Sequence, residues 1–352
     1  MGLFSIKEGE NVMKRITILT TYFGKFNNYF DLWKNAVAYN NTIDFKLITD
    51  NDVNDVPSNM EVIKMGFVEI EKKISSFFDF PVVIGNGYKM SEYQPIFALI
   101  FPELVEGAEF WGYCEMDLIL GNLRHFFTDE ILEAYDKVYW LGHLTLYKNN
   151  EKMNHLPLMN HKFPTATYKQ AFTTPYNYHF IEGGAMKWIA KYSGCKCYEA
   201  IEFADVSFRY FNFTLARGKN PDCPQIYRWI NGEVYRLYVK DGKIVEEELS
   251  YVHLQKRKME NKIKEVTNSF LIIPNSFIDD IDVSIQLILD NSHNTIEWKR
   301  WKRDFWRRYY FQTLKQGGIK IKMDKIMRRI LCSRNILPNI SEDDMEENAD
   351  GN

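Results

Sequence analysis

The chain has 352 residues, which suits one large domain with appendages or two domains, and its formal net charge is −3. Its 45% hydrophobic and 26% charged residues are ordinary for a soluble globular protein. No run reaches the roughly 18 to 20 uninterrupted apolar residues of a membrane span, and the first residues lack the apolar core of a signal peptide. The five scattered cysteines do not form the pattern of a disulfide framework, so we expect reduced thiols in a cytoplasmic protein.

Strands and helices alternate at the start of the chain, after a loose lead-in over residues 1–13. A β-branched strand is predicted over 16–21 and ends in a turn at Gly24; a helix follows over 28–40. Further strands are predicted over 43–52 and 60–66. Strand, helix and strand within about 35 residues form the βαβ pattern of a parallel sheet.

The middle of the chain continues this pattern and ends in an antiparallel region. The patterns predict a helix over 90–107, strands over 110–120 and 137–149, an irregular stretch over 150–180, a short helix over 186–194, and a meander over 226–255 with turns at Asn231-Gly232 and Asp241-Gly242. The predicted fold class is therefore α/β, with a mixed, mostly parallel sheet flanked by helices.

The character of the chain changes after residue 256. Residues 298–334 hold 13 Lys or Arg against two Asp, a net of +11, so the remainder sums to −14. Aromatic residues interleave with these cations, which suits the anionic headgroup region of a membrane. Packing on the rest of the protein and nucleic-acid binding are the alternatives, in that order, and we expect no nucleic-acid partner. We expect a basic helical extension over 259–340 and an acidic disordered tail over 341–352.

Two carboxylates interrupt the apolar run from Phe110 to Leu120. In an extended strand Glu115 and Asp117 would project to the same side, and burying two unpaired carboxylates is costly, so a cation is their natural partner. Mg²⁺ or Mn²⁺ accepts such ligands and leaves room for substrate phosphates. The alternative is an exposed strand end paired with Arg124 or a lysine.

The segment FWGYCEMDLILGNLRHFF resembles the metal-binding strand of GT-A-type glycosyltransferases. More narrowly, the chain resembles a bacterial glycosyltransferase-like group of capsule and surface polysaccharide biosynthesis. The motifs that carry this resemblance are Tyr22-Phe23-Gly24, KMSEYQP over 89–95, Glu115-Met116-Asp117, GHLTLYKN over 142–149 and YVHLQKR over 251–257. The resemblance implies a GT-A-like, Rossmann-like catalytic domain over residues 14–258.

The resemblance also implies roles at the metal. Asp117 would be the direct ligand, and Glu115, which stands where Asp is usual, would contact metal-bound water or the ribose. His253 would be a late histidine ligand, although a lone strand histidine is also commonly structural or exposed. Lys256 and Arg257, which follow His253, supply two cations suited to a diphosphate.

Donor-binding residues are expected at the ends of the first two strands. In a GT-A fold, Thr20, Thr21 and Tyr22 would contact the nucleotide base, and Asp50 would bond the base or ribose; a plain strand-to-loop turn is the alternative. Lys89 and Glu92 precede the acidic motif and are expected to line the sugar site.

An inverting transferase also needs a general base for the acceptor hydroxyl. Glu182 is the first candidate because Gly183-Gly184 permits close approach of a substrate, and Asp205 is the second. His143 and His179 are weaker options, and a retaining enzyme would need no such base.

Together these features predict a metal-dependent glycosyltransferase. It would transfer a sugar from a nucleoside diphosphate donor, with a UDP-sugar favoured, to a glycan or a lipid-linked acceptor. It would be cytoplasmic, with the inner face of the cell membrane as a peripheral contact. The alternatives are a non-catalytic sugar- or nucleotide-binding module and a nucleotidyltransferase, which is disfavoured because no Gly-rich phosphate loop follows the first strand.

Overall fold

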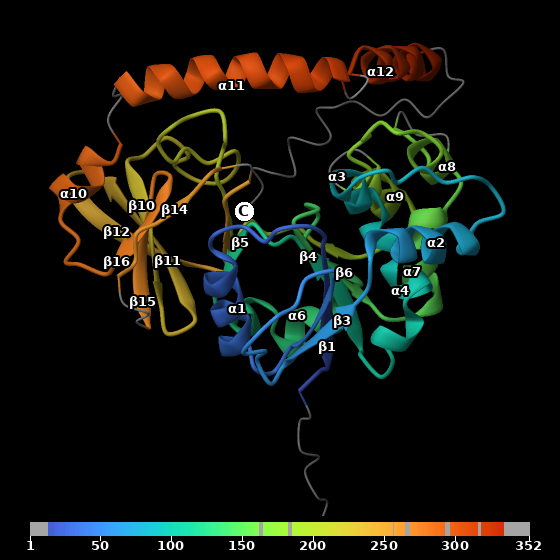
Figure 1. Ribbon diagram of the computed structural model, residues 1–352, viewed down its shortest axis with the longest axis horizontal. Helices are drawn as coiled ribbons and strands as arrows, with labels where there is room; N and C mark the ends of the chain where they lie inside the picture. The colour runs from blue at the N-terminus through green and yellow to red at the C-terminus, as the bar shows by residue number, and fades with distance from the viewer. Residues whose placement is uncertain are drawn as a thin grey trace, which may run out of the picture.

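The computed structural model describes residues 13–161, 165–181, 185–255, 257–264, 268–292, 296–315 and 318–333. A seven-stranded sheet lies at its centre, in the order β3-β2-β1-β4-β7-β6-β8 (Figure 1). Its strands are β1 (Ile16–Tyr22), β2 (Asp44–Thr49), β3 (Met60–Lys64), β4 (Phe110–Cys114), β6 (Lys137–Val138), β7 (Leu144–Lys148) and β8 (Cys197–Tyr198). The strands β1 to β4 run parallel to one another, whereas β7 is antiparallel to β4 and β6.

Apolar side chains alternate along β1 and give the sheet a core on each face. Ile16 and Ile18 join the cluster under α1 (Phe30–Tyr39), whereas Leu19 joins the cluster under α2 (Phe67–Phe77) and α9 (Met186–Tyr192). Helices therefore cover both faces, which suits a mostly parallel sheet. This arrangement confirms the predicted fold class.

Two smaller sheets complete the described structure. The first has the order β12-β11-β10-β15-β16-β14, and the second is β5 (Leu118–Leu120), β13 (Tyr251–His253) and β9 (Ala204–Asp205). The six strands of the first are β10 (Gln225–Ile230), β11 (Glu233–Lys240), β12 (Lys243–Leu249), β14 (Glu260–Asn261), β15 (Ser269–Ile273) and β16 (Ser276–Asp279). The predicted meander is confirmed for β10 to β12, whereas its last part, β13, belongs to the second small sheet. The Asn-Gly and Asp-Gly turns have positive φ at both residues, as type I′ hairpins require.

The single strand predicted over 110–120 is wrong. It is two strands in different sheets, β4 and β5, and Glu115 to Asp117 form the connection between them. The helix predicted over 90–107 is also interrupted, because Pro95 and Pro102 remove backbone donors. It consists of the 3₁₀ segment Ser91–Ile96, helix α4 (Phe97–Ile100) and the 3₁₀ segment Pro102–Leu104.

The expected helical extension starts later than predicted. Residues 260–279 hold β14 to β16, and β15 pairs with β10, so a division at residue 258 would cut across this sheet. The helices that follow are α10 (Ile285–Asp290), α11 (Ile296–Lys315) and α12 (Gly318–Ser333). The lead-in up to residue 12 and the acidic tail lie outside the described residues.

Gly112 of β4 offers a test of how tightly the central strands pack. A Cβ there would lie 2.2 Å from the Thr145 carbonyl oxygen and 2.6 Å from Leu146 Cδ2. We therefore expect Gly112→Ala to lower the free energy of unfolding by about 1–3 kcal/mol in urea denaturation. Gly87→Ala, which meets nothing within 4 Å, is the matched control, and equal losses in both variants would contradict the prediction.

Candidate metal centre

The connection between β4 and β5 is held by three other parts of the chain. The Glu115 N–H donates to the His143 carbonyl at 2.8 Å, and the Leu254 N–H donates to the Asp117 carbonyl at 3.0 Å. The Asn27 side-chain amide donates to the Met116 carbonyl at 3.5 Å. The backbone of the acidic motif is therefore fixed from the first, middle and last parts of the domain.

His253 meets both carboxylates of this motif. Its Nε2 lies 3.4 Å from Glu115 Oε2 and 3.6 Å from Asp117 Oδ1. The pairing of β13 with β5 produces this contact, because it sets His253 directly opposite Leu118, the residue after Asp117. The structure thus brings together the three residues that the sequence predicted to hold a metal.

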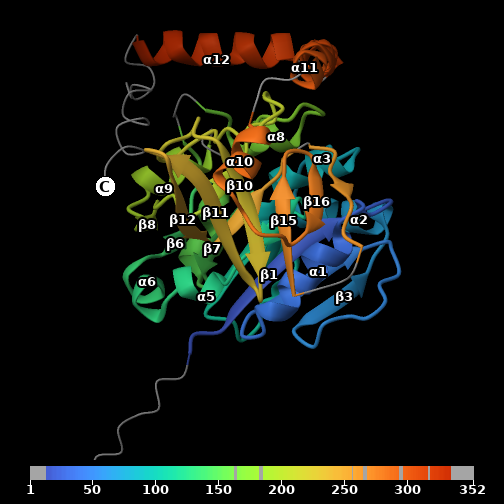
Figure 2. The ribbon, with the colours of Figure 1, turned by 90° about the vertical axis from the view of Figure 1, so that its left-hand side faces the viewer.

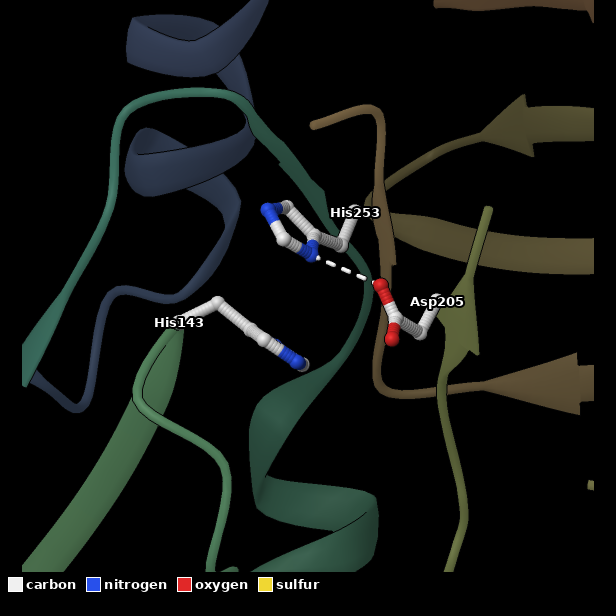
Figure 3. Close-up of side chains that lie close together, drawn as sticks. All are labelled: His143, Asp205 and His253. Atoms are coloured by element: carbon white, nitrogen blue, oxygen red, sulfur yellow. Dashed lines mark hydrogen bonds and ion pairs between the residues drawn. The ribbon is translucent and has the colours of Figure 1, made fainter. Parts of the chain in front are cut away.

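Asp205 bonds the other nitrogen of the same imidazole (Figure 3). Its Oδ1 lies 3.0 Å from His253 Nδ1, and the Gln255 side-chain amide donates to the same oxygen at 2.6 Å. A carboxylate at Nδ1 fixes the proton there in the neutral imidazole and leaves the Nε2 lone pair directed at Glu115 and Asp117. Carboxylate–histidine pairs of this kind support metal-binding histidines.

His143 extends the cluster. Its ring stacks on that of His253 with centroids 4.2 Å apart, and its Nδ1 lies 2.8 Å from the Tyr251 hydroxyl. Figure 3 shows the side chains of His143, Asp205 and His253 coming together from different segments of the chain. Within the described residues two groups place three ligand atoms within 4.8 Å of one another: one is Glu115, Asp117 and His253, and the other is His143, Asp205 and His253.

The electrostatics of the cluster favour a cation. Burial alone would lower the pKa of His253, but the charge of Asp117 and the hydrogen bonds with Asp117, Asp205 and Glu115 raise it well above its usual value. Burial would likewise raise the pKa of Asp205, but its bonds to His253 and Gln255 and the nearby His143 hold it below the usual range. Three carboxylates around one imidazolium leave excess negative charge. Carboxylate oxygens and one imidazole nitrogen fit a divalent ion such as Mn²⁺ or Mg²⁺.

The residues at the ends of the first strands lie near this cluster or shape the loops around it. Burial, and then the charge of Asp117, raises the pKa of the Tyr22 phenol, so this phenol lies within the field of the acidic motif. Thr21 is half-buried beside it, and the buried Thr20 hydroxyl contacts the Cys114 thiol at 3.0 Å. Asp50 accepts a bond from the Gly24 N–H at 2.9 Å and thereby joins the loops after β1 and β2.

Lys89 and Glu92 form a fully buried ion pair. The Lys89 ammonium also donates to the carbonyls of Ala171 at 2.6 Å and Tyr176 at 2.5 Å. Glu92 accepts bonds from the Tyr178 N–H and, at 3.3 Å, from the Phe180 N–H. The bonds of this pair therefore anchor residues 171–180 to the core.

Arg257 uses its guanidinium within the protein. It is 4% exposed, and it donates to the carbonyls of Ser207, Tyr210, Phe211 and Asn212 and to the Asn275 side chain, at 2.6 to 3.1 Å. It holds the loop after β9, so these bonds compete with the phosphate contact expected from the sequence. His179 lies in the anchored segment with φ of 55°. Glu182 and Lys256 lie outside the described residues.

Sequence reasoning missed the roles of Tyr251 and Gln255. The alternation of the YVH strand was the available signal for Tyr251, because residues 251 and 253 share a face of β13. No local signal joins Gln255 to Asp205, since the two are 50 positions apart.

The fold and site together define a mixed α/β protein with a partly buried acidic–histidine cluster at the end of a central strand. The chain belongs to a family whose model matches residues 18–281 and whose description is "Family of unknown function (DUF6625)". This match covers the three sheets and ends before α10. No curated protein sequence matches the chain.

Solved structures of LgtC show a distant likeness. One, a galactosyltransferase LgtC in complex with donor and acceptor sugar analogues, has a TM-score of 0.25 at 10% identity, over 39% of this chain and 58% of that one. A second, an active-site mutant of LgtC, has a TM-score of 0.23 at 10% identity, over 38% and 57%. The match thus spans less than two thirds of LgtC, and TM-scores of this size establish neither a common fold nor a common function.

The buried ion pair gives a stability prediction. We expect Lys89→Met to lower the free energy of unfolding by about 3–5 kcal/mol, because it leaves the Glu92 carboxylate buried without its cation. The double variant Lys89→Met/Glu92→Met removes both charges and should recover most of that loss in urea denaturation. A double variant as unstable as the single one would contradict this account.

The raised pKa of His253 gives a pH prediction. Without metal, the ion pairs of His253 stabilise the fold below the unfolded pKa of about 6.5, and this contribution is lost as pH rises through the raised folded pKa. Metal binding must displace the Nε2 proton, so we expect Mn²⁺ affinity to rise by up to about tenfold per pH unit below that pKa. Calorimetric titration with Mn²⁺ alone would measure it. If affinity is constant above pH 5, His253 is not a ligand.

Proposed function

We propose that this protein is a metal-dependent glycosyltransferase. It would move a hexosyl group from a nucleoside diphosphate donor, most simply a UDP-sugar, to a glycan or lipid-linked acceptor of a cell-surface polysaccharide. The observation that supports this proposal is the convergence of Glu115, Asp117 and His253 after the central strand β4. Ligands of open α/β sheets bind at this end of the strands.

Each residue of the cluster has a physical role in this proposal. Asp117, Glu115 and the His253 Nε2 would hold Mn²⁺ or Mg²⁺, and the bound cation would supply charge stabilisation for the departing nucleoside diphosphate. Asp205 orients the His253 ring through Nδ1, and Tyr22, at the end of β1, would meet the donor. Asp205 is poorly suited to be the general base, because its carboxylate is already bonded to His253 and Gln255 and its pKa is lowered.

We also propose a cytoplasmic location with contact at the inner face of the membrane. Within the described residues no helix is long and apolar enough to cross a membrane. A lipid-linked acceptor would place the reaction at the membrane surface, and the C-terminal helices supply the aromatic and basic composition that suits this location.

A non-catalytic sugar- or nucleotide-binding module is the second candidate. The feature that favours it is Glu115, whose extra methylene alters the reach of a carboxylate where the resembled family has Asp. The enclosed Arg257 guanidinium also leaves one fewer cation for a leaving diphosphate than the sequence predicted.

Substitutions at the cluster test the proposal. With Mn²⁺ and a panel of nucleoside diphosphates, we expect a thermal shift that Asp117→Ala abolishes. Sugar-nucleotide hydrolysis should fall by roughly 10–100-fold in Asp205→Asn, as for an outer-shell partner, and by more in Asp117→Ala. Asp31→Ala, at a carboxylate 85% exposed on α1, is the matched control.

The results separate the candidates. A nucleotide-dependent shift without hydrolysis of any sugar nucleotide would support the binding module. If no nucleotide stabilises the protein and Asp117→Ala behaves as the parent chain, the glycosyltransferase and a nucleotide-binding module are both wrong.

A further inference from the structure

The last two helices form a layer at one end of the molecule. Figures 1 and 2 show α11 and α12 side by side in this layer and running in different directions. The chain enters β1 at one end of the molecule, and this layer lies at the opposite end. The carboxyl ends of β1 and its parallel neighbour β4, where Tyr22 and Glu115 lie, therefore point toward the layer.

One face of each helix contacts the body of the protein. The Trp301 indole N–H of α11 donates to the Phe208 carbonyl at 3.1 Å, and its ring meets Phe211 edge-on at 6.1 Å. On α12, Lys320 lies over the Tyr176 ring at 5.5 Å, and Ile321 is half-buried. These contacts define the inner side of the layer.

The outer side is apolar. Ile319, Met323, Ile326 and Ile330 of α12 are three or four positions apart, so they share one face, and Met323 is 65% exposed and Ile326 56%. On α11, Trp306, Tyr310 and Leu314 lie about 140° to 180° around the helix from Trp301, and Phe311 lies on the flank between the two sides. The exposed large hydrophobic side chains of this outer face are Trp306, Tyr310, Phe311, Leu314, Ile319, Met323, Ile326, Met327 and Ile330.

Cations accompany this apolar face. Among the side chains that the structure describes on α11 and α12, the exposed cations are Lys299, Lys302, Arg303, Arg307, Arg308 and Lys322, besides Lys320 on the inner side. The net of +11 over residues 298–334 contrasts with −14 for the remainder of the chain. An anionic surface would attract this layer and repel the rest of the protein, so charge alone would orient the molecule.

We propose that the outer face of α11 and α12 docks on the surface of an anionic lipid bilayer. Such a surface offers phosphate groups to the cations and an acyl boundary to the apolar stripe at the same time. A second copy of the chain is disfavoured as the occupant, because it would bring two strongly basic helix pairs together and their like charges would repel. Nucleic acid would satisfy the cations but leave the aliphatic stripe of α12 in water. The lipid surface is the occupant that matches both properties.

Vesicle sedimentation of the full chain tests this proposal. The vesicles are phosphatidylcholine with about one third phosphatidylglycerol, compared with phosphatidylcholine alone, at low and high salt and without metal or nucleotide. We expect binding to anionic vesicles that weakens in high salt. Met323→Glu/Ile326→Glu should reduce the bound fraction about tenfold. Because the assay needs neither metal nor donor, its failure is distinct from failure of the proposed glycosyl transfer.

The matched control is Val56→Glu/Val68→Glu, which adds the same charge at exposed apolar residues of the body. It should sediment with the vesicles as the parent chain does. All replaced side chains are exposed, and unchanged thermal unfolding would verify that both variants fold. The proposal is overturned if the parent chain does not sediment with anionic vesicles at low salt, or if the two double variants bind these vesicles equally. It is also overturned if the helix variant instead dissociates a solution dimer, or if a DNA duplex displaces the vesicles.

Discussion

The convergence of three carboxylates on one buried imidazole, that of His253, is the constraint on which the rest of the site depends. The half-buried Glu115 and Asp117 and the buried Asp205 all approach His253, and carboxylates withdrawn from water in this way need their charges offset. Three sheets meet at this point, because β4 ends there in the central sheet, β13 crosses it, and β12 leads into it from the meander. The mixed architecture is thus what allows acids and histidines from distant segments to share one small volume.

The sequence predicted which residues meet in this cluster better than how they meet. Glu115 and Asp117 were paired on the assumption of one extended strand, whereas they lie in a turn between two sheets and are brought together by His253. Hydrophobic periodicity identifies β1, β2 and α1 because each is a local pattern. It cannot reveal that β13 pairs with both β5 and β9, since strand partners far apart in the chain leave no mark on either segment.

The partners of the charged side chains were the least predictable feature of the candidate site. Lys89 and Glu92 carry the charges expected of a sugar site, yet both are directed at backbone groups of residues 171–180. Arg257 follows a candidate metal ligand and nevertheless clamps the loop over 207–212. A sequence shows that a cation is present, but whether carbonyls or a ligand satisfy it depends on which loop packs over it.

The connection between β4 and β5 also bears on how the chain acquires its native state. The Tyr251–His143 contact spans 108 positions and the His253–Asp205 bond spans 48, so the cluster depends on contacts between segments far apart in the chain. Such contacts cost the most chain entropy and form slowly. During synthesis, β1 to β4 can pair before β13 is made. Glu115 and Asp117 are then exposed to water and not yet paired with His253. A divalent cation bound at completion would stabilise the last long-range closure, so the same ligands would serve folding as well as substrate binding.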